Sequence, residues 1–338
     1  MFDHDLNTHT SGPAIRARGL TKAYTLHRTE PGLGGAVRGL FHRRTETRLA
    51  VTDLDLTIEA GEFTGLLGRN GAGKTTTLKM LCGLLRPTGG ELNVLGQQPF
   101  RRQYEFLSQI AVVLGQKSML WWDVSTMDSL LIHKEMYDLD GHQFRTSVAE
   151  LTELLDIADL LDVPVRRLSL GERMKCELTA ALVHRPRLLF LDEPTIGLDV
   201  VSTVAIREFL ARVNTELGTT IILTSHNMDD VEMLCRRVVL IDHGRLAFDG
   251  DLADLVRSAR PTKRVTLTFS APPTVSPMPP GVVVVIRHDH DRLELEVERD
   301  RVPELLATAP SWAPLTDVAV VEADLVDVMR DILVGGQS

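Results

Sequence analysis

The feature that most constrains this chain is a glycine-rich segment, Gly68 to Thr75, with the sequence GRNGAGKT. It follows an apolar run, Phe63–Leu67, that is typical of a buried strand, and it opens a predicted helix from Lys74 to Gly83. Glycines let a backbone curl around a ligand with its N–H groups pointing inward, and the positive end of the helix dipole faces the same point. The pattern therefore predicts a strand, a phosphate-binding loop and a helix, in that order.

Two side chains of this loop carry most of the expected chemistry. Lys74 would supply a point charge to the outer phosphates of a nucleotide, and Thr75 would supply a hydroxyl ligand to Mg²⁺. The other residues that we expect to contact the nucleotide here are Gly68, Asn70, Gly71, Ala72, Gly73 and Thr76. By itself the motif indicates no more than a phosphate loop.

A pair of adjacent carboxylates, Asp192 and Glu193, ends the apolar run Leu188–Leu191. Such a strand either simply emerges into solvent or places charge where chemistry requires it. With a phosphate loop upstream we favour the second interpretation, in which Asp192 holds Mg²⁺ through water. Glu193 would then polarise the water that attacks the terminal phosphate.

Strand-like and helix-like segments alternate from about residue 14 to residue 258, which predicts an α/β fold with a parallel sheet between helices. Nine of the 16 prolines lie beyond residue 260, six of them between Pro261 and Pro280, which indicates a linker. We expect a flexible tail over 1–13, a main domain over 14–258, a linker over 259–281, and a small α+β domain over 282–338 that also includes a strand at 264–270. The elements predicted for the small domain are strands at Val265–Phe269, Val282–Ile286 and Leu293–Val297, a helix at Val302–Thr308, and a closing helix that begins near Leu325.

Charge and composition exclude several classes of protein. The chain has 37 basic and 46 acidic residues, a net charge of -9 and a pI near 5.7, so most of its surface would repel nucleic acid. It has no run of the roughly 18 to 20 apolar residues that span a bilayer, and its first residues lack the pattern of a secretory signal. We expect a cytoplasmic protein that neither binds nucleic acid nor crosses the membrane itself, with Cys82, Cys176 and Cys235 in the core.

In the order of these motifs the chain resembles the nucleotide-binding subunits of ATP-binding cassette (ABC) transporters, over about Ala14 to Arg257. The resemblance implies a P-loop NTPase domain with a helical subdomain. It also implies that Tyr24 stacks on adenine and that Gln116 touches Mg²⁺ or the attacking water. Asp199 matches the loop that crosses a dimer interface, and His226 matches the switch histidine at the terminal phosphate. Each of these four could be structural if considered alone, so the assignments depend on their order.

The segment Leu168–Glu172 reads LSLGE where the family has LSGGQ, so it departs at Leu170 and Glu172. The resemblance makes Ser169, Gly171 and Glu172 contacts to the nucleotide of a partner subunit. Ser169 and Glu172 also fit a helix capping box, and the two interpretations are compatible because a capped helix N-terminus can bind an anion. The leucine would narrow the approach of the partner, and the glutamate would add a negative charge near phosphate.

The resemblance implies an ATPase that binds ATP and Mg²⁺, dimerises with a second copy around two ATP, and drives a separate integral membrane permease. Three features resemble the ATPase subunits of ABC-2-type exporters, especially drug or viologen exporters: the sequence VVLGQKSMLWWDVSTMDS, the long insert after Tyr24 and the separate C-terminal domain. This resemblance implies small amphipathic or cationic cargo. The permease would dock near Gln116–Asp128, which includes Trp121 and Trp122, and would hold the chain at the inner face of the plasma membrane. The alternative function is a non-transport ABC ATPase with a regulatory or assembly role.

A basic, glycine-rich insert is expected between two strands at about residues 25–49. Within Leu26–Arg48 five arginines stand against two glutamates, a local charge of +3 in an acidic chain. One interpretation is an ordinary solvated loop. The other is a segment that serves assembly or contacts anionic lipid or permease, and takes no part in ATP chemistry.

Overall fold

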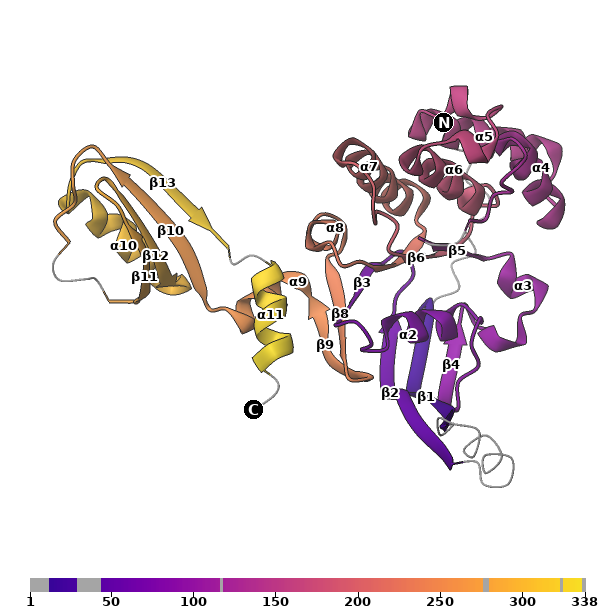
Figure 1. Ribbon diagram of the computed structural model, residues 1–338, viewed down its shortest axis with the longest axis horizontal. Helices are drawn as coiled ribbons and strands as arrows, with labels where there is room; N and C mark the ends of the chain where they lie inside the picture. Colours follow the sequence, from indigo (N-terminus) through magenta and orange to yellow (C-terminus); the bar gives the residue numbers. More distant parts are fainter. Residues whose placement is uncertain (1–11, 29–43, 116–117, 276–279, 323–324, 336–338) are drawn as a thin grey trace, which may run out of the picture. The chain divides into compact units, whose positions relative to one another are not determined.

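The computed structural model describes residues 12–28, 44–115, 118–275, 280–322 and 325–335 (Figure 1). The chain divides into two compact units, Met1–Asp249 and Gly250–Ser338. This division falls earlier than the expected domain end at residue 258, because helix α9 (Leu252–Ala259) contacts α11 (Leu325–Gly335) of the second unit. Within the ranges described, no helix is both long and apolar enough to span a bilayer.

A six-stranded sheet of order β5-β6-β7-β3-β8-β9 forms the centre of the first unit. Its strands are β3 (Phe63–Leu67), β5 (Ile110–Leu114), β6 (Leu188–Asp192), β7 (Thr220–Thr224), β8 (Arg237–Asp242) and β9 (Arg245–Asp251). The pairs β5–β6, β6–β7, β3–β7 and β3–β8 are parallel. Strands covered on both faces need apolar residues throughout, as in the fully buried β3 and β7. The predicted α/β fold with a parallel sheet is confirmed.

A second, antiparallel sheet of order β2-β1-β4 consists of β1 (Ile15–Arg28), β2 (Arg44–Ile58) and β4 (Gly89–Val94). Strands β1 and β2 pair as far as Arg28 opposite Arg44. The structure therefore differs from the expected insert at both ends, and residues 29–43 lie outside the described part of the chain. The extension was hard to predict because Thr47, Arg48 and Leu49 are all exposed, which removes the apolar alternation that marks a strand.

Helices cover the central sheet and extend to one side of it. They are α2 (Lys74–Leu81), α3 (Tyr104–Leu107), α4 (Thr126–Met136), α5 (Gly141–Leu155), α6 (Leu170–Leu182), α7 (Val200–Leu217) and α8 (Met228–Leu234), with short 3-10 turns at Pro99–Arg101, Ala158–Leu160 and Val165–Arg167. Figure 1 shows α4, α5 and α6 gathered together, and α6 contacts both of the others. These three helices form the predicted helical subdomain.

One hydrophobic core joins the two sheets of the first unit. Leu20 and Leu54 of the antiparallel sheet pack in the same buried cluster as Phe190 and Val239 of the parallel sheet. All four side chains are fully buried. Cys82, Cys176 and Cys235 are buried and unpaired, as predicted. The elements that carry the site described below therefore share one packed core.

The second unit has an antiparallel sheet of order β11-β12-β10-β13. Its elements are β10 (Thr262–Phe269), β11 (Val282–His288), β12 (Arg292–Glu298), α10 (Val302–Thr308) and β13 (Leu315–Val321), with 3-10 turns at Arg299–Arg301 and Ala309–Ser311. Alternate residues of β10 and β12 form a core with α10. The three predicted strands and the helix Val302–Thr308 are confirmed, whereas β13 was missed because most of its side chains are exposed.

Candidate functional site

The glycine-rich loop joins β3 to α2, and its glycines are required by the backbone. Gly68 has φ +144°, and a Cβ there would lie 2.1 Å from the carbonyl oxygen of Ile241. Gly73, which precedes α2, has φ +112°, and its Cβ would lie 2.6 Å from the carbonyl oxygen of Ala50. Because both neighbours are backbone atoms, no other residue fits these two positions without moving the loop.

Lys74 is the first residue of α2 and is 6% exposed. Its ammonium donates hydrogen bonds to the carbonyl oxygens of Gly68 at 2.6 Å and Arg69 at 3.2 Å, so it is held across the loop. Burial lowers the pKa of Lys74, and the nearby carboxylates of Glu193 and Asp192 oppose that shift. A buried cation of this kind is well suited to bind an anionic group that enters the loop.

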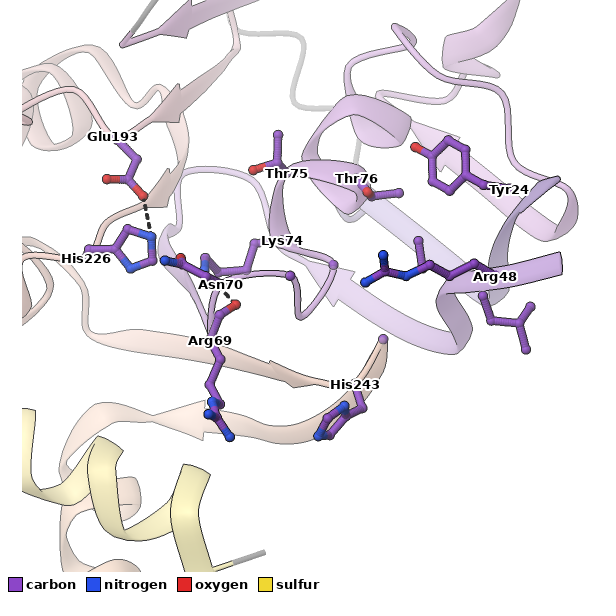
Figure 2. Close-up of a pocket in the computed structure, with 15 residues that line it drawn as sticks. Tyr24, Arg48, Arg69, Asn70, Lys74, Thr75, Thr76, Glu193, His226 and His243 are labelled. Atoms are coloured by element: carbon purple, nitrogen blue, oxygen red, sulfur yellow. Dashed lines mark hydrogen bonds and ion pairs between the residues drawn. The ribbon is translucent and has the colours of Figure 1, made fainter. Parts of the chain in front are cut away.

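The loop forms the floor of a cavity of about 500 Å³ (Figure 2). The predicted residues that line it are Tyr24, Asn70, Gly71, Gly73, Lys74, Thr75, Thr76, Glu193 and His226. A volume of this size suits a nucleotide-sized ligand. Tyr24 is 37% exposed, and Lys22 Nζ lies 5.4 Å from the centroid of its ring.

Six further residues line the same cavity and were not found from the motifs: Arg48, Leu49, Ala50, Arg69, His243 and Gly244. Arg48 and Leu49 belong to β2, in the segment that was expected to form an insert, and they line the cavity. His243 and Gly244 belong to the β8–β9 turn, where Gly244 N donates to the carbonyl oxygen of Ala72 at 2.8 Å. No local sequence signal predicts that this turn contacts the phosphate loop, because only tertiary packing brings the two together.

Asp192 and Glu193 lie at the carboxyl end of β6, where parallel pairing sets Asp192 beside Leu114 and Thr224. The hydroxyl of Thr224 donates to Asp192 Oδ1 at 2.6 Å, which fixes that carboxylate. Glu193 follows with φ +58°, a left-handed conformation that is rare outside glycine. The chain therefore turns sharply directly after Asp192.

The Glu193 carboxylate contacts His226, with 2.9 Å between Oε1 and Nε2 (Figure 2). Partial burial raises the pKa of Glu193, while His226 acts to lower it and the Asp192 carboxylate acts to raise it further. A carboxylate with a raised pKa is a better proton acceptor than an exposed one. Glu193 and His226 thus form a pair at the edge of the cavity that holds Lys74.

A second cavity of about 420 Å³ adjoins the first, because both are lined by Thr75, Glu193 and His226. Asp192 also lines it, so a hydroxyl and a carboxylate face one space, and such oxygen donors suit Mg²⁺ bound together with substrate phosphates. Among the residues that the structure describes, no group of three or more His, Cys, Asp or Glu side chains could hold a metal by itself. Gln116, the other predicted ligand, lies outside those residues.

The predicted signature residues form a separate group that does not line either cavity. Ser169 caps α6, since Glu172 Oε2 accepts from Ser169 N at 2.8 Å and Ser169 Oγ accepts from Glu172 N at 3.3 Å. Asp199 caps α7 by accepting from Ser202 N at 2.9 Å. Gly171 packs on α7, where an added Cβ would lie 2.2 Å from Ser202 Oγ. The capping box predicted for α6 is therefore confirmed, but this chain does not bring its own signature to its own phosphate loop.

A phosphate loop, a carboxylate pair and a histidine at one edge of a parallel sheet define a P-loop NTPase site. The family described as ABC transporter matches residues 51–196. The chain is 34% identical over 220 residues to the ABC transporter ATP-binding protein NatA of Bacillus subtilis (strain 168), covering 65% of this chain and 89% of that protein. The chain belongs to the ABC transporter family as an ATP-binding subunit, and it is an ATPase.

Other comparisons agree with this assignment. The Nod factor export ATP-binding protein I of Burkholderia pseudomallei (strain K96243) is 37% identical over 212 residues, covering 62% of this chain and 68% of that protein. The methionine import ATP-binding protein MetN of Latilactobacillus sakei subsp. sakei (strain 23K) is 26% identical over 311 residues, covering 87% and 88%. A solved ATP-binding subunit of an ABC transporter shares the fold, with a TM-score of 0.61 at 23% identity over 72% of this chain and 92% of that chain.

Proposed function

We propose that this chain is the ATPase subunit of an ABC-2-type exporter, which dimerises around two ATP and drives a separate membrane permease. The observation that carries the proposal is the Glu193–His226 pair at the edge of the Lys74 cavity. In this arrangement Glu193 accepts a proton from the attacking water, and His226 contacts the terminal phosphate. Lys74 holds the outer phosphates, so catalysis is mostly positioning and charge stabilisation.

Thr75 and Asp192 would hold Mg²⁺ in the cavity that they share, together with the phosphates of ATP. The ion would neutralise charge that develops on the terminal phosphate. Tyr24 would stack on the adenine at the opposite end of the first cavity, and Arg48 beside it would add a positive charge. These assignments account for most of the polar lining.

A second copy of the chain is the partner that would complete each site. Ser169, Gly171, Glu172 and Asp199 do not line the cavities, so a second subunit would have to present them. The surface around them is apolar: the exposed fractions are 80% for Val200 and Val201, 50% for Ile196 and 39% for Leu170. Exposed side chains of this kind favour a partner that buries them.

The permease would dock on α4 and on the segment before it, at the inner face of the membrane. Trp121 is 43% exposed and Trp122 is 53% exposed, so both indoles are available to a partner. Leu131, Ile132 and Met136 on α4 add further exposed apolar area, at 44%, 38% and 56%. Large aromatic side chains are frequent anchors of protein interfaces.

The export direction and the cargo are the finer part of the proposal. They are supported by the Nod factor relative, whose name describes export, and by the sequence resemblance to drug and viologen exporters. The MetN relative, whose name describes import, has lower identity over a longer alignment. We propose small amphipathic or cationic cargo on this basis.

Co-purification from membranes tests the proposal. The chain is expressed in its native host, so that its own permease is present, and the double variant Trp121→Ala/Trp122→Ala is compared with Leu217→Ala, an exposed apolar control at the far end of α7. We expect the tryptophan variant to lose most of the co-purifying permease while it binds ATP normally, and the control to retain it. If the parent chain recovers no membrane protein at all, a non-transport role replaces the proposal.

A further inference from the structure

Asp230, on α8, is a fully buried carboxylate that lines neither cavity. Burying a charge is costly unless ion pairs and hydrogen bonds compensate for the lost water. The Asp230 carboxylate therefore requires compensating contacts, and three side chains provide them.

Each oxygen of Asp230 has its own partners. Oδ1 accepts from Arg207, at 2.6 Å from Nε and 2.5 Å from Nη2. Oδ2 accepts from the hydroxyl of Ser225 at 2.9 Å and from the hydroxyl of Thr195. Arg207, Ser225 and Thr195 are at most 8% exposed, so water does not compete for these bonds.

The three partners belong to the three segments that carry the proposed catalytic and interface residues. Thr195 stands two residues after Glu193, and Ser225 stands immediately before His226. Arg207 lies on α7, the helix that Asp199 caps. The Asp230 carboxylate thus connects the three segments that carry Glu193, His226 and Asp199.

The geometry at Glu193 shows why such a tie is needed. Its φ of +58° is unfavourable for a residue with a side chain, so the surrounding structure must hold it. Its own backbone N donates to the carbonyl oxygen of Thr224 at 3.0 Å, and its carbonyl oxygen accepts from Ile196 N at 3.3 Å, so the backbone bonds of the turn are local. The bond from Thr195 to Asp230 adds a side-chain contact that joins the residues after Glu193 to α8.

We infer that Asp230 is a positioning residue for ATP hydrolysis, which holds the turn after Glu193 and the turn before His226 in one register. This inference rests on the proposed roles of Glu193 and His226. Displacing a catalytic group by about 1 Å can cost about a hundredfold in rate, so a hub of this kind acts on turnover and leaves nucleotide binding unchanged.

The test uses the hydroxyls and not the carboxylate, because Asp230→Asn would leave the buried Arg207 with only the exposed Asp229 carboxylate, 4.0 Å away, as counter-charge and would disturb folding. The variants are Thr195→Val, Ser225→Ala and their combination, with Thr195→Ser as the rescue that restores the hydroxyl. Thr219→Val is the matched control, since this buried hydroxyl donates to the carbonyl oxygen of Pro186 at 3.4 Å, at the start of β7 and away from the site.

Turnover at saturating ATP and the Kd for ATP are measured on the full chain, with unfolding temperature as a folding check. We expect the combined variant to lose at least tenfold in kcat while the Kd changes by less than twofold. Each single variant should lose less, and Thr195→Ser should approach the parent. A merely structural hub predicts the opposite, that kcat follows stability and Thr219→Val is as impaired as Thr195→Val.

Turnover within twofold of the parent in both single variants and in the combination overturns the inference, as does a loss of ATP affinity that accounts for the lost rate. The Glu193→Gln variant separates this outcome from failure of the proposed function. If Glu193→Gln is inactive and the hydroxyl variants are active, only the role of Asp230 is wrong. If Glu193→Gln remains active, the proposed chemistry itself is wrong.

Discussion

Replacing Glu172 by glutamine should weaken the isolated fold slightly and tighten the ATP-bound dimer. The Glu172 carboxylate accepts from the backbone N–H of Ser169 at 2.8 Å, and this bond holds the pKa of Glu172 below its usual value. Glutamine also serves at this position of a capping box, because its amide oxygen can accept the same bond. The substitution therefore removes the charge and keeps the cap.

Two opposing free energies follow from the position of that charge. At the N-terminus of α6 a negative charge stabilises the helix by about 0.3–1 kcal/mol, which the variant loses. In the dimer, the same charge would face the triphosphate of the partner, and two like charges 4 Å apart repel by about 4 kcal/mol at an effective dielectric constant near 20. Allowing for greater separation and for salt, we expect a net gain of about 1 kcal/mol, or about fivefold, in ATP-dependent dimerisation.

The assay measures dimer formation by light scattering during an ATP titration, in a Glu193→Gln background so that ATP persists. Glu208→Gln serves as the control, because it removes the same charge from an exposed position on α7. The gain should shrink as salt rises, because the repulsion is screened. Equal dimerisation of Glu172→Gln and the control, or weaker dimerisation of Glu172→Gln, would refute the idea that this helix faces phosphate.

Two further predictions concern the rate of hydrolysis and the pH dependence of stability. Glu193→Gln should lower turnover by about a hundredfold to ten-thousandfold while ATP binding persists, since the amide cannot accept the proton; phosphate release and a nucleotide titration check this, and near-parental turnover contradicts it. Burial lowers the pKa of His184 to about 4. Between about pH 6.5 and pH 4 this histidine therefore binds a proton in the unfolded chain but not in the folded chain. The free energy of unfolding should therefore fall as the pH drops from about 6.5 towards 4, by up to about 3 kcal/mol. Urea titrations of the parent and of His184→Gln measure this slope, and an unchanged slope in the variant would contradict the assignment.

The local sequence determined the elements whose residues repeat at a short period. Phe63–Leu67 and Val302–Thr308 have the bounds that the pattern predicted, because an apolar run or an amphipathic stripe depends on neighbours in the chain. The glycines of the phosphate loop and the capping box at Ser169 were predictable for the same reason, since φ and capping are local properties. The bond between Glu193 and His226 was not predicted, because the two residues follow different strands and only the sheet brings those strand ends together.

Only the tertiary structure decided which of these elements contact one another. Arg48 and His243 reach the cavity because a strand hairpin and the β8–β9 turn pack over the phosphate loop, and neither has a local signal for that contact. Strand β13 carries mostly exposed side chains, so its sequence has no alternation of buried and exposed residues that would predict a strand. Its pairing with β10 defines it as one. Asp230 is the clearest case, because its three partners stand 5, 23 and 35 residues away in sequence and converge only in the folded chain. Periodicity records what each segment buries, whereas the identity of its neighbours depends on long-range packing that no short stretch of sequence encodes.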